Sequence, residues 1–82
     1  MTRLRLLGRH ACELCETLHG VLLADPVLAR TGITWVDLDE VPALRERYLY
    51  SIPVVLLDDE TEAWVGPADE ATVDAIKAVL AA

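Results

Sequence analysis

The sequence predicts one α/β domain over residues 1–82, in which helices flank a four-stranded mixed sheet in the order β-α-β-α-β-β-α. Three observations lead to this fold class. Hydrophobic residues make up 54% of the 82-residue chain, which is enough for one small core. Strand-like and helix-like patterns alternate through the first half, which indicates a parallel βαβ unit. A short polar turn separates the last two strand-like runs, which indicates an antiparallel hairpin.

The first two strands are predicted from short runs of apolar and β-branched residues. Residues 4–7 are apolar apart from Arg5, and a glycine follows them. Residues 33–38 carry the β-branched and aromatic content of a second strand. Because a charged side chain within a strand needs a partner, we expect Arg5 to pair with Asp37 or Asp39 of that second strand.

A helix is predicted between these two strands. It begins at Cys12, and apolar side chains follow at positions i, i+4, i+7 and i+8, namely Leu14, Leu18, Val21 and Leu22. We expect Pro26 to kink or end this helix, because proline has no N–H for the helical ladder. Thr31-Gly32 is then expected to form the loop that leads into the second strand.

The second half of the chain is predicted to contain a short helix and a hairpin. The helix begins at Asp39-Glu40-Val41-Pro42 and runs through Tyr48, with Tyr50 packed at its end. Residues 54–57 form a continuous apolar run, which is typical of a central strand covered on both faces. Residues 62–65 form the fourth strand.

A closing helix follows a break at Gly66-Pro67. We expect Asp69 to be its N-cap, because a carboxylate can accept the free N–H groups of a first helical turn. Residues at helical spacing then mark one face of the helix, namely Val73, Ile76, Lys77 and Leu80.

The charge balance excludes some classes of partner. The chain carries 14 acidic and 7 basic residues, for a formal net charge of −7. Nucleic acid and anionic membrane surfaces would be repelled, so we expect no partner of either kind. No apolar run reaches the length of a signal peptide core or a transmembrane helix. Two cysteines are too few for the disulfide framework of a small secreted domain, so we expect a cytoplasmic protein. We also expect it to be a monomer.

The two cysteines form a Cys-x-x-Cys pair, Cys12-Glu13-Leu14-Cys15, at the predicted start of the first helix. The unpaired N–H groups and the dipole of that turn stabilise a thiolate. A second thiol three residues further on lies on the same helix face, close enough to form a disulfide. In a reducing compartment this pair is expected to act as a two-electron switch rather than as a structural bond.

A Cys-x-x-Cys pair after the first strand of a βαβ unit is the redox signature of the thioredoxin fold. Three further segments accompany it: Tyr48-Leu49-Tyr50-Ser51-Ile52-Pro53-Val54-Val55, the Gly66-Pro67-Ala68-Asp69 turn and the amphipathic final helix. Together with Gly8-Arg9-His10-Ala11-Cys12-Glu13-Leu14-Cys15-Glu16, they resemble glutaredoxins of the thioredoxin superfamily over the whole chain. The resemblance is closest to a small bacterial glutaredoxin-like branch with a Cys-x-Leu-Cys motif.

The resemblance implies roles for particular residues. Cys12 would be the exposed nucleophile and Cys15 the resolving thiol. Pro53 would be a cis-proline that faces them, and the backbone of Ile52 would be free to pair with an extended substrate.

It also implies residues that bind glutathione, which would be the co-substrate. Arg9 or His10 would take the place of the usual lysine and hold a glutathione carboxylate. Gly66 and Asp69 would form the turn that binds its γ-glutamyl end. The expected activity is the reduction of protein disulfides or glutathione mixed disulfides, with no bound cofactor or metal.

Two other functions are open at this point. A metal or Fe–S carrier could use the same cysteines, because His10, Cys12, Cys15 and His19 are a ligand set that zinc accepts. A redox-silent interaction module with the same fold would leave both thiols unreactive.

Overall fold

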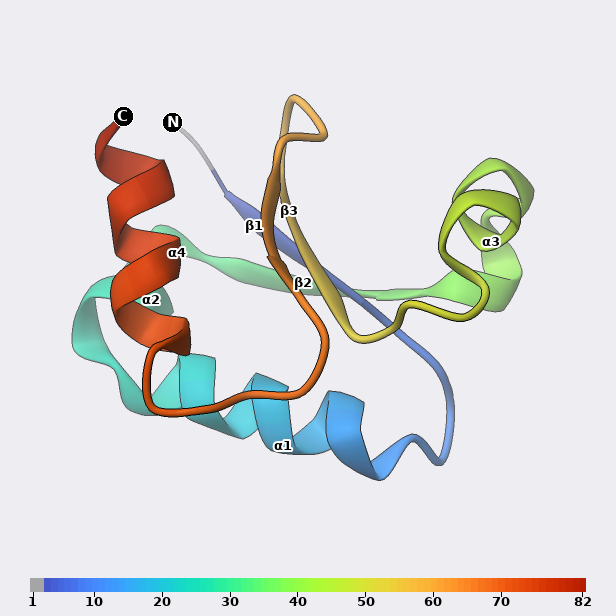
Figure 1. Ribbon diagram of the computed structural model, residues 1–82, viewed down its shortest axis with the longest axis horizontal. Helices are drawn as coiled ribbons and strands as arrows, with labels where there is room; N and C mark the ends of the chain where they lie inside the picture. Colours follow the sequence, from blue (N-terminus) through green and yellow to red (C-terminus); the bar gives the residue numbers. More distant parts are fainter. Residues whose placement is uncertain (1–2) are drawn as a thin grey trace.

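The computed structural model describes residues 3–82, which form a four-stranded sheet with the strand order β2-β1-β3-β4 (Figure 1). The strands are β1 (Leu4–Gly8), β2 (Ile33–Asp37), β3 (Val54–Leu57) and β4 (Glu62–Val65). β1 and β2 are parallel, whereas β1 with β3 and β3 with β4 are antiparallel. The mixed sheet, its parallel βαβ unit and its terminal hairpin are therefore as the sequence predicts.

The first helical segment contains two helices, α1 (Glu13–Ala24) and α2 (Pro26–Thr31), where one was expected. Asp25 separates them and serves both, as the C-cap of α1 and the N-cap of α2. Its carboxylate accepts the N–H groups of Val27 and Leu28, each at 3.1 Å. Pro26 is tolerated at the first position of α2, where its missing N–H would have no intrahelical partner. The proline thus ends one helix and begins another.

The second helical segment also differs from the prediction. β2 ends at Asp37, and a 3-10 helix, η1 (Leu38–Glu40), follows before α3 (Pro42–Tyr48) begins. The Asp37 carboxylate accepts the N–H of Asp39 at 2.9 Å and so caps η1. The acidic residues that were expected in the first turn of the α-helix therefore belong to η1.

The closing helix, α4, spans Thr72–Ala81, and its N-cap is Ala71, which makes no side-chain hydrogen bond to the helix. The expectation that Asp69 is the helix N-cap is wrong by two residues. Asp69 instead stabilises the turn before α4: its carboxylate accepts the N–H of Ala71 at 2.7 Å, and its own N–H donates to Thr72 Oγ1 at 2.8 Å.

The sheet separates two apolar layers. α1, α2 and α4 cover one face through a core that includes Leu4, Leu6, Leu18 and Ile76. α3 covers the other face through a smaller core around Leu7, Leu38, Leu44, Tyr48, Val54 and Leu56. Figure 1 shows α3 at one end of the sheet, away from α1 and α4. No helix within residues 3–82 has the length and apolarity needed to cross a membrane.

Arg5 does not form the predicted ion pair. In the parallel register Arg5 lies opposite Thr34, whereas Asp37 lies opposite Gly8. An offset of three residues places Asp37 about 10 Å further along the strand and on the other face. Among residues 3–82 the buried Nε of Arg5 has no hydrogen-bond partner, and Asp39 pairs with two other arginines.

Candidate active site

The cysteine pair lies where β1 leads into α1. Cys12 is the N-cap of α1, and its Sγ accepts the N–H of Cys15 at 3.2 Å. The two residues are joined by a disulfide, with their Cα atoms 5.2 Å apart. The sulfur of Cys12 therefore occupies the place of a capping oxygen at the positive end of the helix. This position stabilises a thiolate when the disulfide is reduced.

The two sulfurs differ in burial. Cys15 has no exposed surface and belongs to the core beneath α1, whereas Cys12 is half-buried at the edge of that core. A nucleophile must be reached by its substrate, and a resolving thiol needs only to reach the nucleophile. The geometry therefore suits Cys12 to attack and Cys15 to resolve.

Gly8 allows Cys15 to pack against β1, because glycine has no side chain and the surrounding residues leave no room for one. A Cβ atom at this position would lie 2.8 Å from the Trp35 ring and 3.0 Å from the Cβ of Cys15. The role of Gly8 could not be read from the sequence, because Trp35 is distant along the chain and the close approach is tertiary.

The loop that presents Cys12 is tightly turned. The N–H of Cys12 donates to the carbonyl of Arg9 at 3.3 Å, and Ala11 has a φ of 59°. A left-handed conformation is uncommon for alanine and is typical of turns and functional loops. The backbone of Arg9 is thereby fixed next to Cys12.

Pro53 lies at the same end of the sheet as the cysteine loop. The Ile52-Pro53 peptide bond is cis, and Pro53 is buried. Leu7 pairs with Val54 in the antiparallel register, so the next positions outward are Gly8 on β1 and Pro53 before β3. Ile52 is half-buried and packs against both cores.

Gly66 lies on the other side of Pro53. Its N–H donates to the Pro53 carbonyl at 2.8 Å, which continues the pairing of β3 with β4. The indole N–H of Trp64 donates to the carbonyls of Gly66 and Pro67 at 3.0 and 3.2 Å and holds this turn in place. Asp69 is exposed further along, where its carboxylate is engaged in the turn before α4.

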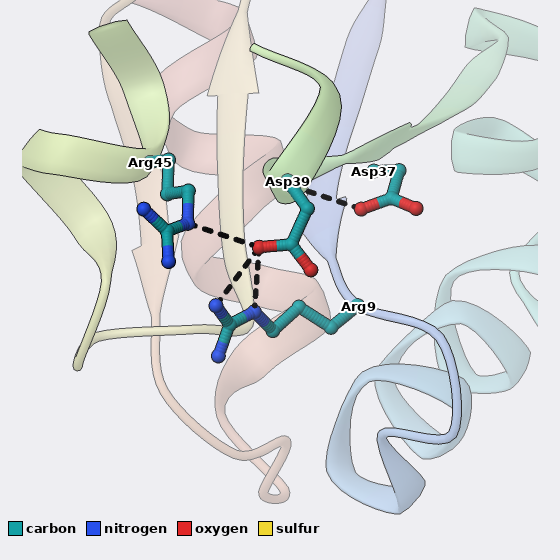
Figure 2. Close-up of polar contacts among 4 residues, drawn as sticks. All are labelled: Arg9, Asp37, Asp39 and Arg45. Atoms are coloured by element: carbon teal, nitrogen blue, oxygen red, sulfur yellow. Dashed lines mark hydrogen bonds and ion pairs between the residues drawn. The ribbon is translucent and has the colours of Figure 1, made fainter. Parts of the chain in front are cut away.

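The guanidinium of Arg9 is bound to Asp39 (Figure 2). Its Nη2 and Nε donate to Asp39 Oδ1 at 2.9 and 3.3 Å, and Arg45 Nε donates to the same oxygen at 3.1 Å. Hydrogen bonding from Arg9 and then from Arg45 lowers the pKa of the Asp39 carboxyl below its ordinary value. This trio of Arg9, Asp39 and Arg45 connects the cysteine loop, the segment after β2, and α3. The sequence indicated neither Asp39 nor Arg45 as part of a site, because Asp39 is distant from Arg9 along the chain.

His10 is exposed and lines a cavity of about 380 Å³ on the β2 side of the cysteine loop. The walls of this cavity are formed by Arg9, His10, Ala11, Glu16, His19, Trp35 and Asp37. The residues expected to bind substrate are therefore divided: Arg9 and His10 line the cavity, whereas Ile52 and Gly66 lie with Pro53 at the β3–β4 side.

The zinc-ligand set suggested by the sequence is not assembled. The ring of His19 packs edge-on against Trp35, with ring centroids 5.4 Å apart. Within the described residues 3–82, no three His, Cys, Asp or Glu side chains form a group that could hold a metal ion.

Comparison with known proteins agrees with this fold. A family model described as "Glutaredoxin-like domain (DUF836)" matches residues 3–81. The X-ray structure of a structural-genomics target protein from X. campestris is similar to this chain, with a TM-score of 0.68 and 28% sequence identity over 96% of this chain and 97% of that chain. No curated protein matches the chain. The thioredoxin-like fold and the glutaredoxin-like resemblance predicted from the sequence are both confirmed.

Proposed function

We propose that this chain, which belongs to the family of glutaredoxin-like domains, is a thiol–disulfide oxidoreductase that acts through Cys12 and Cys15. The observation that carries the proposal is the unequal burial of the pair. Cys12 caps α1 at the surface, Cys15 is enclosed beneath it, and the two sulfurs are within bonding distance. Such an arrangement serves exchange with a partner and not the stabilisation of a core.

The reaction begins with the reduced pair. The Cys12 thiolate attacks one sulfur of a substrate disulfide, so that a Cys12–substrate bond forms and the other substrate sulfur leaves as a thiolate and takes a proton. Cys15 then loses its proton to solvent and attacks Cys12. The second substrate sulfur leaves, and the Cys12–Cys15 disulfide remains. Two electrons pass from the chain to the substrate, and an external thiol reductant of the cytoplasm returns them.

The residues around Cys12 are proposed to hold the substrate. An extended segment would lie along Ile52 and Pro53, where the Ile52 backbone could add a strand-like pairing. Gly66 and Asp69 would contact the far end of that segment. His10 and the cavity wall formed by Arg9 would contact the side chain next to the substrate cysteine.

The substrate class proposed is a disulfide within a protein, acted on by a monomer of this chain. Glutathione is proposed as a co-substrate that recycles the Cys12–Cys15 disulfide. Attack by free glutathione needs access to Cys12 and does not need a bound tripeptide.

Reduction of a protein disulfide should be compared in wild type, Cys12→Ser and Cys15→Ser. Each protein should be recycled once by glutathione with glutathione reductase and once by thioredoxin reductase. We expect Cys12→Ser to lose activity in both systems, because it removes the nucleophile. Loss in Cys15→Ser with both systems would indicate a dithiol route, and retention with glutathione alone would indicate a monothiol route.

Three results would contradict the proposal. Wild-type activity in Cys12→Ser would exclude Cys12 as the nucleophile. Purified protein that carries a metal or cluster on Cys12 and Cys15, and fails to form the disulfide on oxidation, would instead indicate a carrier. Thiols that alkylate no faster than free cysteine would indicate a redox-silent module.

A further inference from the structure

The trio of Arg9, Asp39 and Arg45 has the composition of an anion-binding site that is already occupied. Two guanidinium groups from different elements donate to a single carboxylate oxygen, Asp39 Oδ1 (Figure 2). The planar fork of donors on a guanidinium group matches the geometry of a carboxylate, so arginine is a preferred residue for binding carboxylates. Here the carboxylate belongs to the chain itself.

The occupied site lies beside the nucleophile. Arg9 is three residues before Cys12, and the hydrogen bond from the Cys12 N–H to the Arg9 carbonyl holds the two backbones together. Figure 2 shows the Arg9 side chain extending from the end of β1 to Asp39 and α3. The residue that was expected to hold a glutathione carboxylate is therefore committed to an internal one.

The local charge balance leaves little attraction for a second anion. The two arginines face Asp39, and the carboxylate of the nearby Asp37 accepts the Asp39 N–H. Two positive and two negative groups thus lie together, in a chain whose net charge is −7. A glutathione carboxylate would have to displace Asp39 and would also be repelled by the surrounding charge.

Space for a ligand is present on both sides of the trio. Arg9 and Asp37 line the cavity of about 380 Å³, and Asp39 and Arg45 line a second hollow of about 540 Å³ against α3. A second carboxylate therefore has room to approach the two arginines, and its binding is limited by the Asp39 carboxylate that already occupies them.

We propose that Asp39 is a specificity-determining residue, which occupies the anion-binding position formed by Arg9 and Arg45 and excludes glutathione from it. This inference rests on the proposed function and narrows it. The chain selects disulfides in protein segments, which need no carboxylate anchor, and uses glutathione at most as a reductant that collides with Cys12 without a bound complex.

The test measures binding of S-methylglutathione, a thioether that cannot exchange with the disulfide, by NMR titration of the oxidised protein. Asp39→Asn keeps the shape of the side chain and removes its charge. We expect it to bind this probe on the order of fivefold more tightly than wild type, as expected for one exposed charge-assisted pair. The double variant Asp39→Asn, Arg9→Gln should lose the gain.

Glu40→Gln is the matched control. It removes the same charge from the neighbouring residue, and Glu40 makes no ion pair with Arg9 or Arg45. The proposal is overturned if Asp39→Asn binds the probe no better than Glu40→Gln, or if the gain persists without Arg9. Either result stands apart from the reductase assay, because the probe is redox-inert and Cys12 is not needed.

A second measurement uses the wild type and does not depend on the folding of a variant. The Nε–H signal of Arg9 should not move when S-methylglutathione is added, since Asp39 holds that group. A saturable shift of this signal would show that glutathione reaches Arg9 and would contradict the proposal.

Discussion

Gly8 is the residue at which β1 ends and the loop to Cys12 begins, and its packing links the fold to the cysteine pair. The Trp35 ring and Cys15, the proposed resolving thiol, both lie against the position where a side chain would begin. Cys15 is fully buried here, whereas Cys12 is only partly buried. At the scale of the residue, the lack of a side chain at Gly8 thus allows Trp35 and Cys15 to pack closely against the end of β1.

Substituting Gly8 with alanine should destabilise the protein by about 1–3 kcal/mol, because the added methyl group overpacks the space between Trp35 and Cys15. Gly20→Ala is the matched control. A Cβ at Gly20 meets nothing within 4 Å, and Gly20 lies inside α1, so this change should stabilise by about 0.5–1 kcal/mol. Urea unfolding of the reduced proteins measures both, and equal stability of the two variants would contradict the packing described for Gly8.

At the scale of the element, Asp25 joins three helices. It ends α1, caps α2, and its Oδ1 lies 2.9 Å from Lys77 Nζ on α4. Hydrogen bonding from Lys77, followed by that from the Leu28 N–H, lowers the pKa of the Asp25 carboxyl below its ordinary value. The charged form of this carboxyl is thus favoured in the folded protein.

The lowered pKa of Asp25 predicts how stability depends on pH. A carboxyl whose folded pKa lies below the unfolded value of about 3.9 contributes its stabilisation fully above that value and loses it as the pH falls toward the folded pKa. The Tm of the wild type should therefore decrease when the pH is lowered below about 4. Asp25→Asn should have a Tm a few degrees lower at pH 7 and a weaker dependence on acid, because asparagine keeps the cap but not the charge.

Lys77→Met separates the ion pair from the cap. It should lower the Tm by as much as is expected for Asp25→Asn. Asp25→Ala, which also removes the cap, should lower the Tm further. Thermal unfolding at pH 7 and pH 3 measures all three. An Asp25→Asn variant with the acid dependence of the wild type would show that the Asp25 carboxyl does not contribute to it.

At the scale of the whole molecule, the chain is acidic, and the end of the sheet that carries the cysteine pair is assembled from four segments. The loop to Cys12, η1 with α3, the Ile52-Pro53 turn and the Gly66 turn meet at one end of the sheet. The excess of 14 acidic over 7 basic residues gives the molecule a net charge of −7. Its long-range field would therefore favour a positively charged partner over a negatively charged one.

The rate of reduction of a basic protein disulfide should fall severalfold as salt is raised from about 0.01 M to about 0.15 M, because the Debye length shortens from about 30 Å to about 8 Å. The rate of reduction of bis(2-hydroxyethyl) disulfide, a small neutral substrate, should change little over the same range and serves as the control. Stopped-flow measurement of the first turnover separates this effect from recycling. A basic substrate whose rate is insensitive to salt would show that charge does not guide the encounter.

Local pattern was sufficient for most of the elements. The apolar run at 54–57 and the strand at 62–65 have the predicted bounds, because an apolar run and the polar turn that follows it are properties of neighbouring residues. The break at Pro26 was also local, whereas α2 beyond it was missed because a helix of six residues has little periodicity to detect. Tyr48 and Tyr50 show the limit of local reasoning. Both were expected to pack at the end of α3. Tyr48 is buried, and its hydroxyl donates a hydrogen bond to Glu62 at 2.7 Å, but Tyr50 is 95% exposed.

The sequence by itself determined that this is an α/β domain with a cysteine pair at the start of its first helix, because helical and strand periods, the Cys-x-x-Cys spacing and the capping position are all set within a few residues. Only the tertiary structure decided what surrounds the pair. It packed Gly8 against Trp35, divided His10 and Gly66 between two sides of Cys12, and bound Arg9 to Asp39. These contacts join residues far apart in the chain, and their distances follow from strand register and helix packing, which no local pattern encodes.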